Sequence, residues 1–334
     1  MKKLTHYILP ILVACATTLQ AQDYHLSHYD AAPLYLNPAL TGMSHDMEGD
    51  FRASINSRNQ WRALGTKPFT TYYAGYDMVL KKGDERFGAG GYIINNRGGI
   101  GNFNTFNFMA SGAYDIIKSG SPHVLRTGLN MGLMNKSFRF DNYSFDNQYS
   151  NTTGDFDQSL AHNENFMSSS LFRFDAAFGV YYKYADDSKI YTPAVGIALH
   201  HVTMPKENFS DAEARLPIRW VAHTDCKIIT NEKTFVTPKV LFMQQAKAME
   251  LNMGFNFGYK INNDFAIVPG FYYRNKDAFV ADLGIQFANN MLRFSYDINN
   301  SYLSQFTGGR GAFEISLVMV GEKGKPILPA MSFR

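Results

Sequence analysis

Histidine is the residue type in this chain whose spacing could support catalysis or metal binding, and it occurs in two such arrangements. His200 and His201 are adjacent, and consecutive strand residues point to opposite faces, so the pair could not ligate one metal ion together. We expect both at a barrel or sheet rim, near a strand end. His223 and Asp225 share one face of a predicted strand, flanked by basic residues, and could orient a general base. No nucleophile or second carboxylate accompanies them, so a polar lining of mixed charge is the simpler interpretation.

The rest of the chain also lacks the signatures of an enzyme. The 334 residues contain no phosphate-binding loop, no dinucleotide glycine motif and no HExxH helix. Two cysteines, Cys15 and Cys226, exclude a disulfide framework or a Cys-based zinc module. The net charge of +3 lacks the basic excess of a nucleic-acid-binding protein. We therefore predict no enzymatic activity, no cofactor and no nucleic-acid partner.

The first 21 residues have the pattern of a secretory signal peptide. Lys2 and Lys3 precede an apolar stretch, and cleavage after Ala21 would leave Gln22 first, although Leu19 is large for the −3 position. An alternative is lipidation of Cys15, because the four residues that end there resemble a lipobox. Either route predicts an exported protein.

Long alternating segments follow this leader. In one of them Phe172, Phe174 and Phe178 lie on one face and Arg173 and Asp175 on the other. Such runs last about ten residues, the length that a tilted strand needs to cross a bilayer. Soluble strands average about 5–6 residues, so a soluble sandwich is the less favoured alternative. The pattern predicts an all-β fold, a transmembrane antiparallel up-and-down β-barrel of the outer membrane with about 14 strands.

The strand positions and connections divide the chain into four parts. We predict a signal peptide at 1–21, a periplasmic N-terminal segment or plug at 22–48, the barrel at 49–320 and a periplasmic tail at 321–334. Every second connection is short and polar, whereas 136–170 and 203–215 are long, which is the outer-membrane arrangement of periplasmic turns and extracellular loops. An even strand number then predicts both termini in the periplasm. The strands are predicted to start near Phe51, Phe69, Phe87, Phe103, Val124, Phe172, Ile190, Leu216, Phe235, Leu251, Phe265, Phe279, Leu292 and Gly311.

Prolines and glycines inside predicted strands need an explanation. Pro193, Pro238 and Pro269 lack the N–H that a closed barrel requires at each position, and we expect β-bulges there. A cluster of three glycines at 88–91 predicts close packing or a bulge. The residues from Tyr29 to Gly42 do not alternate at all, and they predict either a plug in the barrel mouth or a docking segment for another protein.

Several short motifs resemble the PorP/SprF family of Bacteroidetes type IX secretion proteins. They are the run Leu34-Tyr35-Leu36-Asn37-Pro38-Ala39-Leu40-Thr41-Gly42, the run Arg58-Asn59-Gln60-Trp61, and Phe313-Glu314-Ile315-Ser316-Leu317 after Tyr296-Asp297-Ile298. The resemblance extends over essentially the mature chain. Its motif residues, to which the family assigns no contact role, are Asn37, Pro38, Ala39, Gly42, Arg58, Gln60 and Trp61.

The resemblance implies an outer-membrane barrel without catalytic function. Family members support type IX secretion and gliding motility, through export or surface retention of large adhesins with a type B C-terminal sorting domain. The implied partners are such an adhesin, type IX secretion components and outer-membrane lipid. Our own candidate contacts are the aromatic residues of the longest loop, Tyr143, Phe145, Tyr149 and Phe156, because exposed aromatics suit protein interfaces. A porin for small solutes, a soluble or adhesive β protein and a barrel hydrolase are the alternatives.

Overall fold

A computed structural model describes the structure over most of the chain. The described residues are 23–43, 49–64, 67–99, 101–118, 120–139, 144–157, 159–160, 169–186, 188–207, 209 and 214–324. The predicted signal peptide with Cys15, positions 44–48 of the N-terminal segment, Tyr143 and positions 325–334 of the predicted tail lie outside them.

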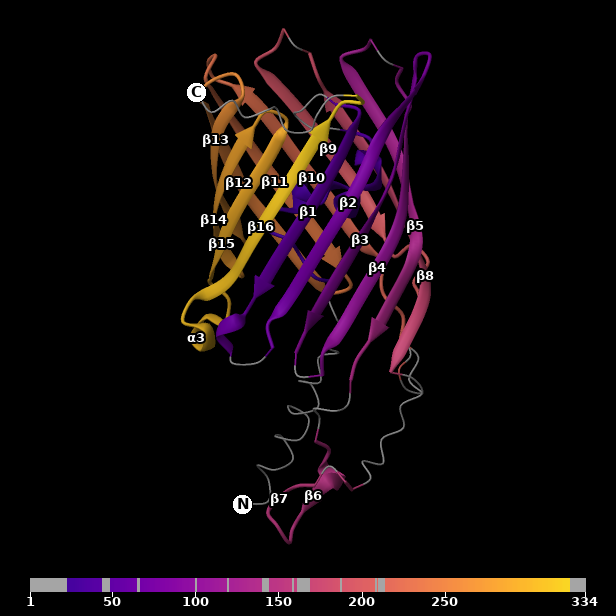
Figure 1. Cartoon of the computed structure of the whole chain (residues 1–334), viewed down its shortest axis with the longest axis vertical. Coiled ribbons are helices and arrows are strands. Elements are labelled where there is room, and N and C mark those ends of the chain that lie inside the picture. The colour runs from indigo at the N-terminus through magenta and orange to yellow at the C-terminus, as the bar shows by residue number, and fades with distance from the viewer. Residues whose placement is uncertain are drawn as a thin grey trace, which may run out of the picture.

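Fourteen antiparallel strands form a closed barrel, as predicted (Figure 1). Consecutive strands are neighbours, and the barrel closes where β1 pairs with β16, from Phe51 opposite Gly321 to Gln60 opposite Ala312. The barrel strands are β1 (Phe51–Gln60), β2 (Phe69–Lys82), β3 (Glu85–Gly98), β4 (Phe103–Asp115), β5 (His123–Ser137), β8 (Ser170–Tyr184), β9 (Tyr191–His200), β10 (Arg219–Ile229), β11 (Thr234–Gln245), β12 (Ala248–Lys260), β13 (Phe265–Arg274), β14 (Ala278–Phe287), β15 (Asn290–Asn299) and β16 (Arg310–Gly321). Every predicted start lies within three residues of the observed one, and the largest differences are Leu216 against Arg219 and Leu251 against Ala248.

The two faces of the wall differ as the alternation predicts. Phe255 and Leu283 are each 45% exposed, on the outer face, whereas their neighbours Asn256 and Asp282 are 6% exposed and face the lumen. An apolar outer face and a polar inner face are typical of a barrel whose outer surface contacts lipid.

A charge on the outer face should therefore impair insertion. We expect Phe255→Arg to destabilise the inserted barrel by about 2–4 kcal/mol if Phe255 lies near the bilayer midplane, because the guanidinium loses its hydration there. Band shift on heating in gel electrophoresis measures the folded fraction. Phe255→Leu is the matched control, since it keeps an apolar side chain, and equal behaviour of the two variants would contradict the assignment of this face.

The prediction of bulges at the strand prolines is wrong. Between β10 and β11 the pairing stops after Asp225 opposite Lys239, and it resumes at Ile228 opposite Val236. The register is the same on both sides of this gap, so the ladder is interrupted at Pro238 without an inserted residue. The same interruption occurs beside Pro269, between β12 and β13. At Pro193 the ladder with β10 is continuous, while the ladder with β8 stops at Ala194. Each ring nitrogen thus lies at a gap in the hydrogen-bond ladder, which relieves the missing donor.

The two ends of the barrel carry different connections. We call the end with the connections 83–84, 116–122, 185–190, 230–233, 261–264 and 288–289 the short-turn rim. The opposite end, the long-loop rim, carries 61–68, 99–102, 138–169, 201–218, 246–247, 275–277 and 300–309. In Figure 1 the long-loop rim is at the bottom, where α3 (Ser304–Thr307) flanks it and a small hairpin projects beyond it.

This hairpin was missed by the sequence analysis. It consists of η4 (Asp146–Gln148), β6 (Tyr149–Ser150) and β7 (Asp155–Phe156), and the rings of Tyr149 and Phe156 lie 5.4 Å apart in a T-shaped contact. Strands of two residues leave no alternation that a sequence pattern could reveal. None of the helices in the described part of the chain is sufficiently long and apolar for a membrane span.

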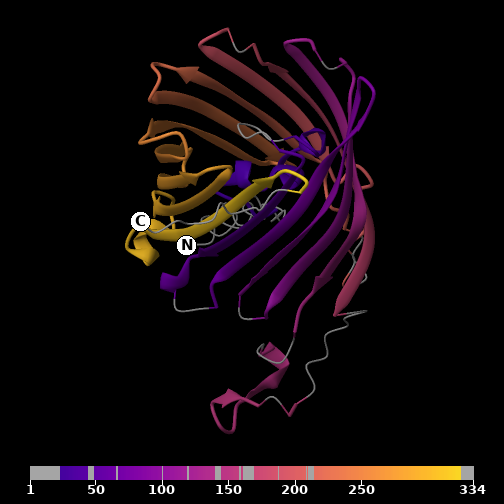
Figure 2. The same cartoon turned by 45° about the horizontal axis from the view of Figure 1, so that its top comes forward.

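The N-terminal segment lies inside the barrel. Figure 2 shows its short helical turns within the ring of strands. We call residues 23–43 the plug; it contains η1 (Tyr29–Ala31), α2 (Pro33–Leu36) and η2 (Pro38–Leu40). Its contacts show that it crosses the lumen from one rim to the other, as described below.

Candidate functional site

The plug owes its compact turns to a few residues with special backbone properties. Pro33 and Pro38 each occupy the first turn of a helix, where the missing N–H costs nothing. The Asn37 side chain caps η2 by accepting a hydrogen bond from the Ala39 N–H at 2.9 Å. Gly42 ends the plug with a φ of +67°, in the left-handed region that favours glycine. The family-motif residues of this segment are thus the ones that shape the plug.

Glycines in the barrel wall make room for these turns. A Cβ atom added to Gly128 would lie 2.3 Å from the Pro38 carbonyl carbon, and one added to Gly179 would lie 2.0 Å from Asn37 Oδ1. At Gly88 it would lie 1.9 Å from the Thr41 carbonyl oxygen. The glycine cluster of β3 therefore permits close packing, one of the two roles predicted for it. We call this glycine-lined surface the socket.

Buried charges fix the middle of the plug to the last strands. The Glu314 carboxylate accepts hydrogen bonds from the Ser27 N–H at 2.7 Å and the His28 N–H at 2.9 Å. Arg58 donates to Glu314 at 3.0 Å and to Asp297 at 2.8 Å, and all of these side chains are buried. In this arrangement each buried carboxylate receives hydrogen bonds from the protein itself, which offsets the cost of burying its charge.

Asp30 of the plug joins two basic residues of the wall, Lys239 of β11 and Arg293 of β15. Its carboxylate pairs with Lys239 and Arg293, each at 2.5 Å. Arg293 also pairs with Asp282, at 2.6 Å, and Asp282 in turn contacts His28 at 3.0 Å.

The lumen-facing position of Asp282 on its strand predicts, from the sequence alone, that replacing it should have a mild effect on barrel insertion. The structure contradicts this expectation, because the loss of its carboxylate would leave buried basic groups with fewer partners.

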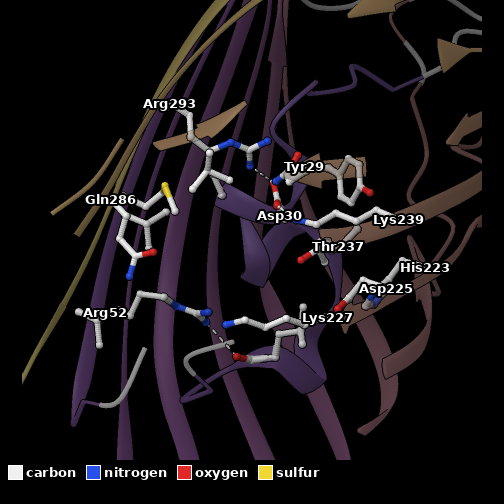
Figure 3. Close-up of a pocket in the computed structure, with 18 of the residues that line it drawn as sticks. Tyr29, Asp30, Arg52, His223, Asp225, Lys227, Thr237, Lys239, Gln286 and Arg293 are labelled. Carbon is white, nitrogen blue, oxygen red and sulfur yellow. Dashed lines mark hydrogen bonds and ion pairs between the residues drawn. The ribbon is translucent and has the colours of Figure 1, made fainter. Parts of the chain in front are cut away.

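A cavity of about 140 Å³ lies between the plug and the wall, nearer the short-turn rim (Figure 3). Tyr29 and Asp30 of the plug line one side, and Asp225 and Lys227 of β10 line another. The mixed charge of β10 is the polar lumen lining that the sequence predicts for this strand.

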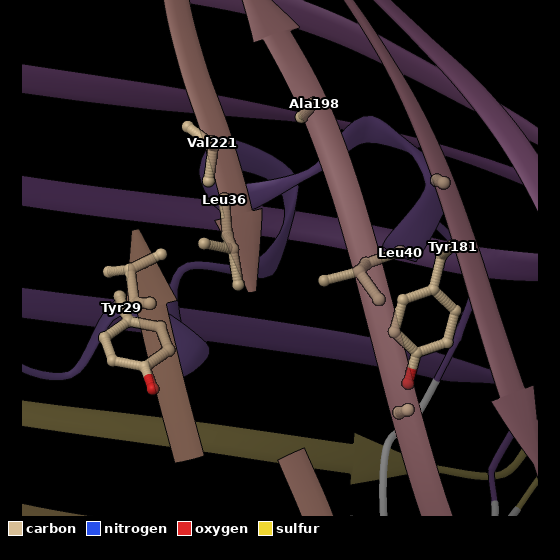
Figure 4. Packing of buried hydrophobic residues seen from close by; sticks show 9 residues of the cluster. Tyr29, Leu36, Leu40, Tyr181, Ala198 and Val221 are labelled. Carbon is tan, nitrogen blue, oxygen red and sulfur yellow. The ribbon is translucent and has the colours of Figure 1, made fainter. Parts of the chain in front are cut away.

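Apolar plug residues pack against the wall beside this cavity. Leu36 and Leu40 contact a cluster that includes Tyr181 and Val221, all buried (Figure 4). His223 is stacked on Tyr181, with ring centroids 5.9 Å apart, and lies 3.2 Å from the Asn37 amide nitrogen. The histidine that could have oriented a general base thus supports the plug.

His200 and His201 also contact the plug. His201 lies between two carboxylates, with Nδ1 2.6 Å from Asp175 and Nε2 2.6 Å from Asp23. Their position at the end of β9 was predicted, and the structure adds that both imidazoles are buried. Since His201 follows the strand and has a φ of +58°, strict alternation does not apply to it.

The contacts of Asp23 show where the plug ends. Besides His201 it meets Arg219, the first residue of β10, at 3.2 Å, and its N–H donates to Gln245, the last residue of β11. All three lie at the long-loop rim. Gly321 lies at the short-turn rim, where its carbonyl accepts from the Asp50 N–H. The described part of the chain thus begins at the long-loop rim and ends at the short-turn rim, because the plug crosses the lumen. The periplasmic placement of the two termini stays a prediction.

The charge of His201 makes this contact dependent on pH. Burial disfavours the imidazolium, but the carboxylates of Asp23 and Asp175 outweigh it and raise the pKa of His201 to about 9. The charged imidazole therefore stabilises the folded state, and its contribution is complete below about pH 6.5, the ordinary pKa of histidine. This contribution is lost as the pH rises through about 9, the pKa of His201 in the folded protein. We expect hydrogen exchange at residues 23–28 to accelerate between pH 7 and 10 beyond the intrinsic base effect. His201→Gln should remove this extra acceleration, and an unchanged profile would contradict the assignment.

A larger cavity, of about 530 Å³, opens at the long-loop rim. We call it the mouth cavity. Trp61, Phe69 and Phe103 line its wall, and Asp23 and His25 of the plug lie at its base. Gln60 also lines it, so two of the family-motif residues share this cavity with the end of the plug.

The predicted site residues thus fall into three groups. Asn37, Pro38, Ala39 and Gly42 form the plug turns, Arg58 anchors the plug, and Gln60 and Trp61 line the mouth cavity. Phe145, Tyr149 and Phe156 belong to the projecting hairpin, away from the first two groups. Glu314 and Asp297 belong to runs that resemble the family, but their role as buried partners of the plug, like that of Arg293, was not predicted. Lumen-facing charges have the same sequence pattern whether water or a plug covers them. Over the described ranges, no group of three or more His, Cys, Asp or Glu side chains could hold a metal ion.

Comparisons with known proteins agree with this architecture. A family model described as type IX secretion system membrane protein PorP/SprF matches residues 18–319. No curated protein matches the chain. Similar solved structures include a Pseudomonas aeruginosa FadL homologue, 11% identical over 84% of this chain and 92% of that chain, with a TM-score of 0.51. A mutant of the monoaromatic hydrocarbon channel TodX is 10% identical over 86% and 92%, with a TM-score of 0.50. At such identities the likeness shows the outer-membrane barrel fold alone.

Proposed function

Because the chain belongs to the PorP/SprF family of type IX secretion membrane proteins, we propose that this outer-membrane barrel is a non-enzymatic support for secretion or surface anchoring of a large adhesin. The adhesin would carry a type B C-terminal sorting domain, and gliding motility is the process that such adhesins serve. The long-loop rim would face the exterior, as longer loops do in barrels of this class.

The plugged lumen is the observation that carries this proposal. Residues 23–43 fill the centre of the barrel, their turns fit a glycine-lined socket, and their polar groups bond to the wall. A barrel closed by its own chain suits a docking role better than passage of solutes. His223, the strongest candidate for catalysis, lines the cavity of about 140 Å³ and contacts Asn37 and Tyr181, so its described contacts support the plug.

Purification from the native outer membrane in mild detergent tests the proposal. We expect mass spectrometry to find a large exported protein with a C-terminal sorting domain at near-equal amount. A barrel that elutes alone and conducts ions in a planar bilayer would instead support the channel alternative.

Deleting residues 144–157, which form the projecting hairpin, tests where such a partner binds. The hairpin pairs only with itself among the described strands, so the barrel should fold normally while the partner is retained less well. Heat-induced band shift verifies folding. Unchanged surface retention would exclude the hairpin, including Phe145, Tyr149 and Phe156, from the interface.

A further inference from the structure

We propose that the mouth cavity binds an aromatic or large aliphatic side chain carried by a basic segment of the exported partner. This inference rests on the proposed function and adds to it a binding site and the chemistry of the ligand.

The wall of the mouth cavity is aromatic on its lumen side. Phe103 begins β4 on the inward face, yet it is 41% exposed because no side chain of the plug covers it. The ring of Phe69 packs against Trp61, with centroids 5.4 Å apart, and Phe209 lies 6.5 Å from Phe103. An exposed apolar surface inside a concave site of this volume is typical of ligand binding.

The base of the cavity is closed. Asp23 is bonded to His201 and Gln245, and Tyr24 is stacked on Tyr35 with ring centroids 5.6 Å apart. A group that enters from the long-loop rim therefore meets the end of the plug. This geometry favours binding over passage.

Trp61 is held in an uncommon backbone conformation. Its φ of +58° lies in the left-handed region, which bulky residues rarely adopt. The Trp61 N–H donates to the Gly311 carbonyl at 2.9 Å, and this bond together with the packing on Phe69 fixes the indole at the cavity wall. Strained residues that the surrounding structure holds in place cluster at binding sites.

The charge beside the entrance indicates a basic ligand. The described residues 144–157 contain three Asp and no Lys or Arg. These residues, Asp146, Asp155 and Asp157, are exposed on and beside the projecting hairpin, near the exposed rings of Tyr149 and Phe156. Complementary charge steers a partner and sets its orientation. A cavity and a separate acidic, aromatic hairpin form a surface suited to a polypeptide, which can contact both at once.

Photo-crosslinking from inside the cavity tests the inference in the full-length barrel. p-Benzoylphenylalanine replaces Phe103 in one variant and Phe106, on the outer face of the same strand, in the control. We expect an adduct with the co-purifying exported protein from position 103 only. Its crosslinked peptide should carry an aromatic or large aliphatic residue next to Lys or Arg.

Truncation of the same side chain provides the second measurement. Phe103→Ala should lower the amount of co-eluting partner by about tenfold or more, as loss of an interface anchor does. Phe106→Ala should leave it unchanged, and the heat-induced band shift should show that both variants fold.

The outcomes separate this inference from the proposed function. If the wild-type barrel retains an exported partner but position 103 gives no adduct and Phe103→Ala retains the partner equally, the cavity inference is wrong and the proposed function stands. If the wild-type barrel elutes alone, both are wrong.

Toluene binding provides a third measurement. The Trp220→Phe variant has Trp61 as its one tryptophan, so a change in tryptophan fluorescence on addition of toluene reports binding near Trp61. A saturable response to toluene without any adduct would assign the cavity to small apolar molecules and overturn the inference.

Discussion

Gly128→Val will displace the plug and open the lumen to ions. A Cβ atom at position 128 would lie 2.3 Å from the Pro38 carbonyl carbon and 2.4 Å from the Ala39 nitrogen. Both are backbone atoms of a helical turn, so the turn must leave the socket to relieve the contact. Overpacking costs typically about 1–3 kcal/mol even where side chains can adjust, and here a backbone must move. In planar bilayers we expect discrete current steps from the variant and none from the wild-type barrel.

Gly112→Val in β4 is the matched control for this experiment. The nearest atom to a Cβ at position 112 is the Gly88 carbonyl oxygen, at 3.8 Å, an ordinary contact distance. This variant should remain closed. Limited proteolysis should cleave residues 23–43 in Gly128→Val and spare them in the control. A silent Gly128→Val barrel with a protected plug would show that the socket tolerates the added side chain.

Arg58→Ala will cause the largest loss of stability among the single substitutions considered. The guanidinium contacts Asp297 at 2.8 Å and Glu314 at 3.0 Å, and none of the three side chains is exposed to water. Removal of the guanidinium leaves the carboxylates of Asp297 and Glu314 buried. Asp297 keeps Arg274 as a basic partner, whereas Glu314 loses its pairing with Arg58. Breaking a buried pair from one side costs about 3–5 kcal/mol. Unfolding in urea, monitored by heat-induced band shift, measures the difference.

Lys82→Ala tests whether loss of a positive charge alone has this effect. Lys82 ends β2 at the short-turn rim and is exposed, so its removal should change the unfolding free energy by less than about 1 kcal/mol. If Arg58→Ala were equally mild, the buried charges would not be what holds the plug.

The wall of the barrel could be predicted from the sequence because its signal is local. Alternation of Phe255 with Asn256, and of Leu283 with Asp282, depends only on neighbouring residues and the environment of each face. Turn residues marked the short connections in the same way. The strand starts follow from these two patterns alone.

The interior could not be predicted to the same depth, because it depends on contacts between distant residues. Nothing local distinguishes Glu314, which bonds to Ser27, from a carboxylate that faces water. The socket glycines were recognised at 88–91 but not at Gly128 or Gly179, where a single glycine in a strand has several explanations. The path of the plug was missed for the same reason, since Asp23 meets His201 across 178 residues.

The bond between Ser27 and Glu314 joins residues 287 positions apart. β16 is the last strand of the barrel in sequence order, so its contacts with the N-terminal residues close the longest loop of the fold. Closing a long loop is slow and costs conformational entropy. The same strand that completes the wall by pairing with β1 also supplies the carboxylate that fastens the plug. Closure of the wall and seating of the plug therefore depend on the same strand, and a chain lacking residues 310–321 would gain neither.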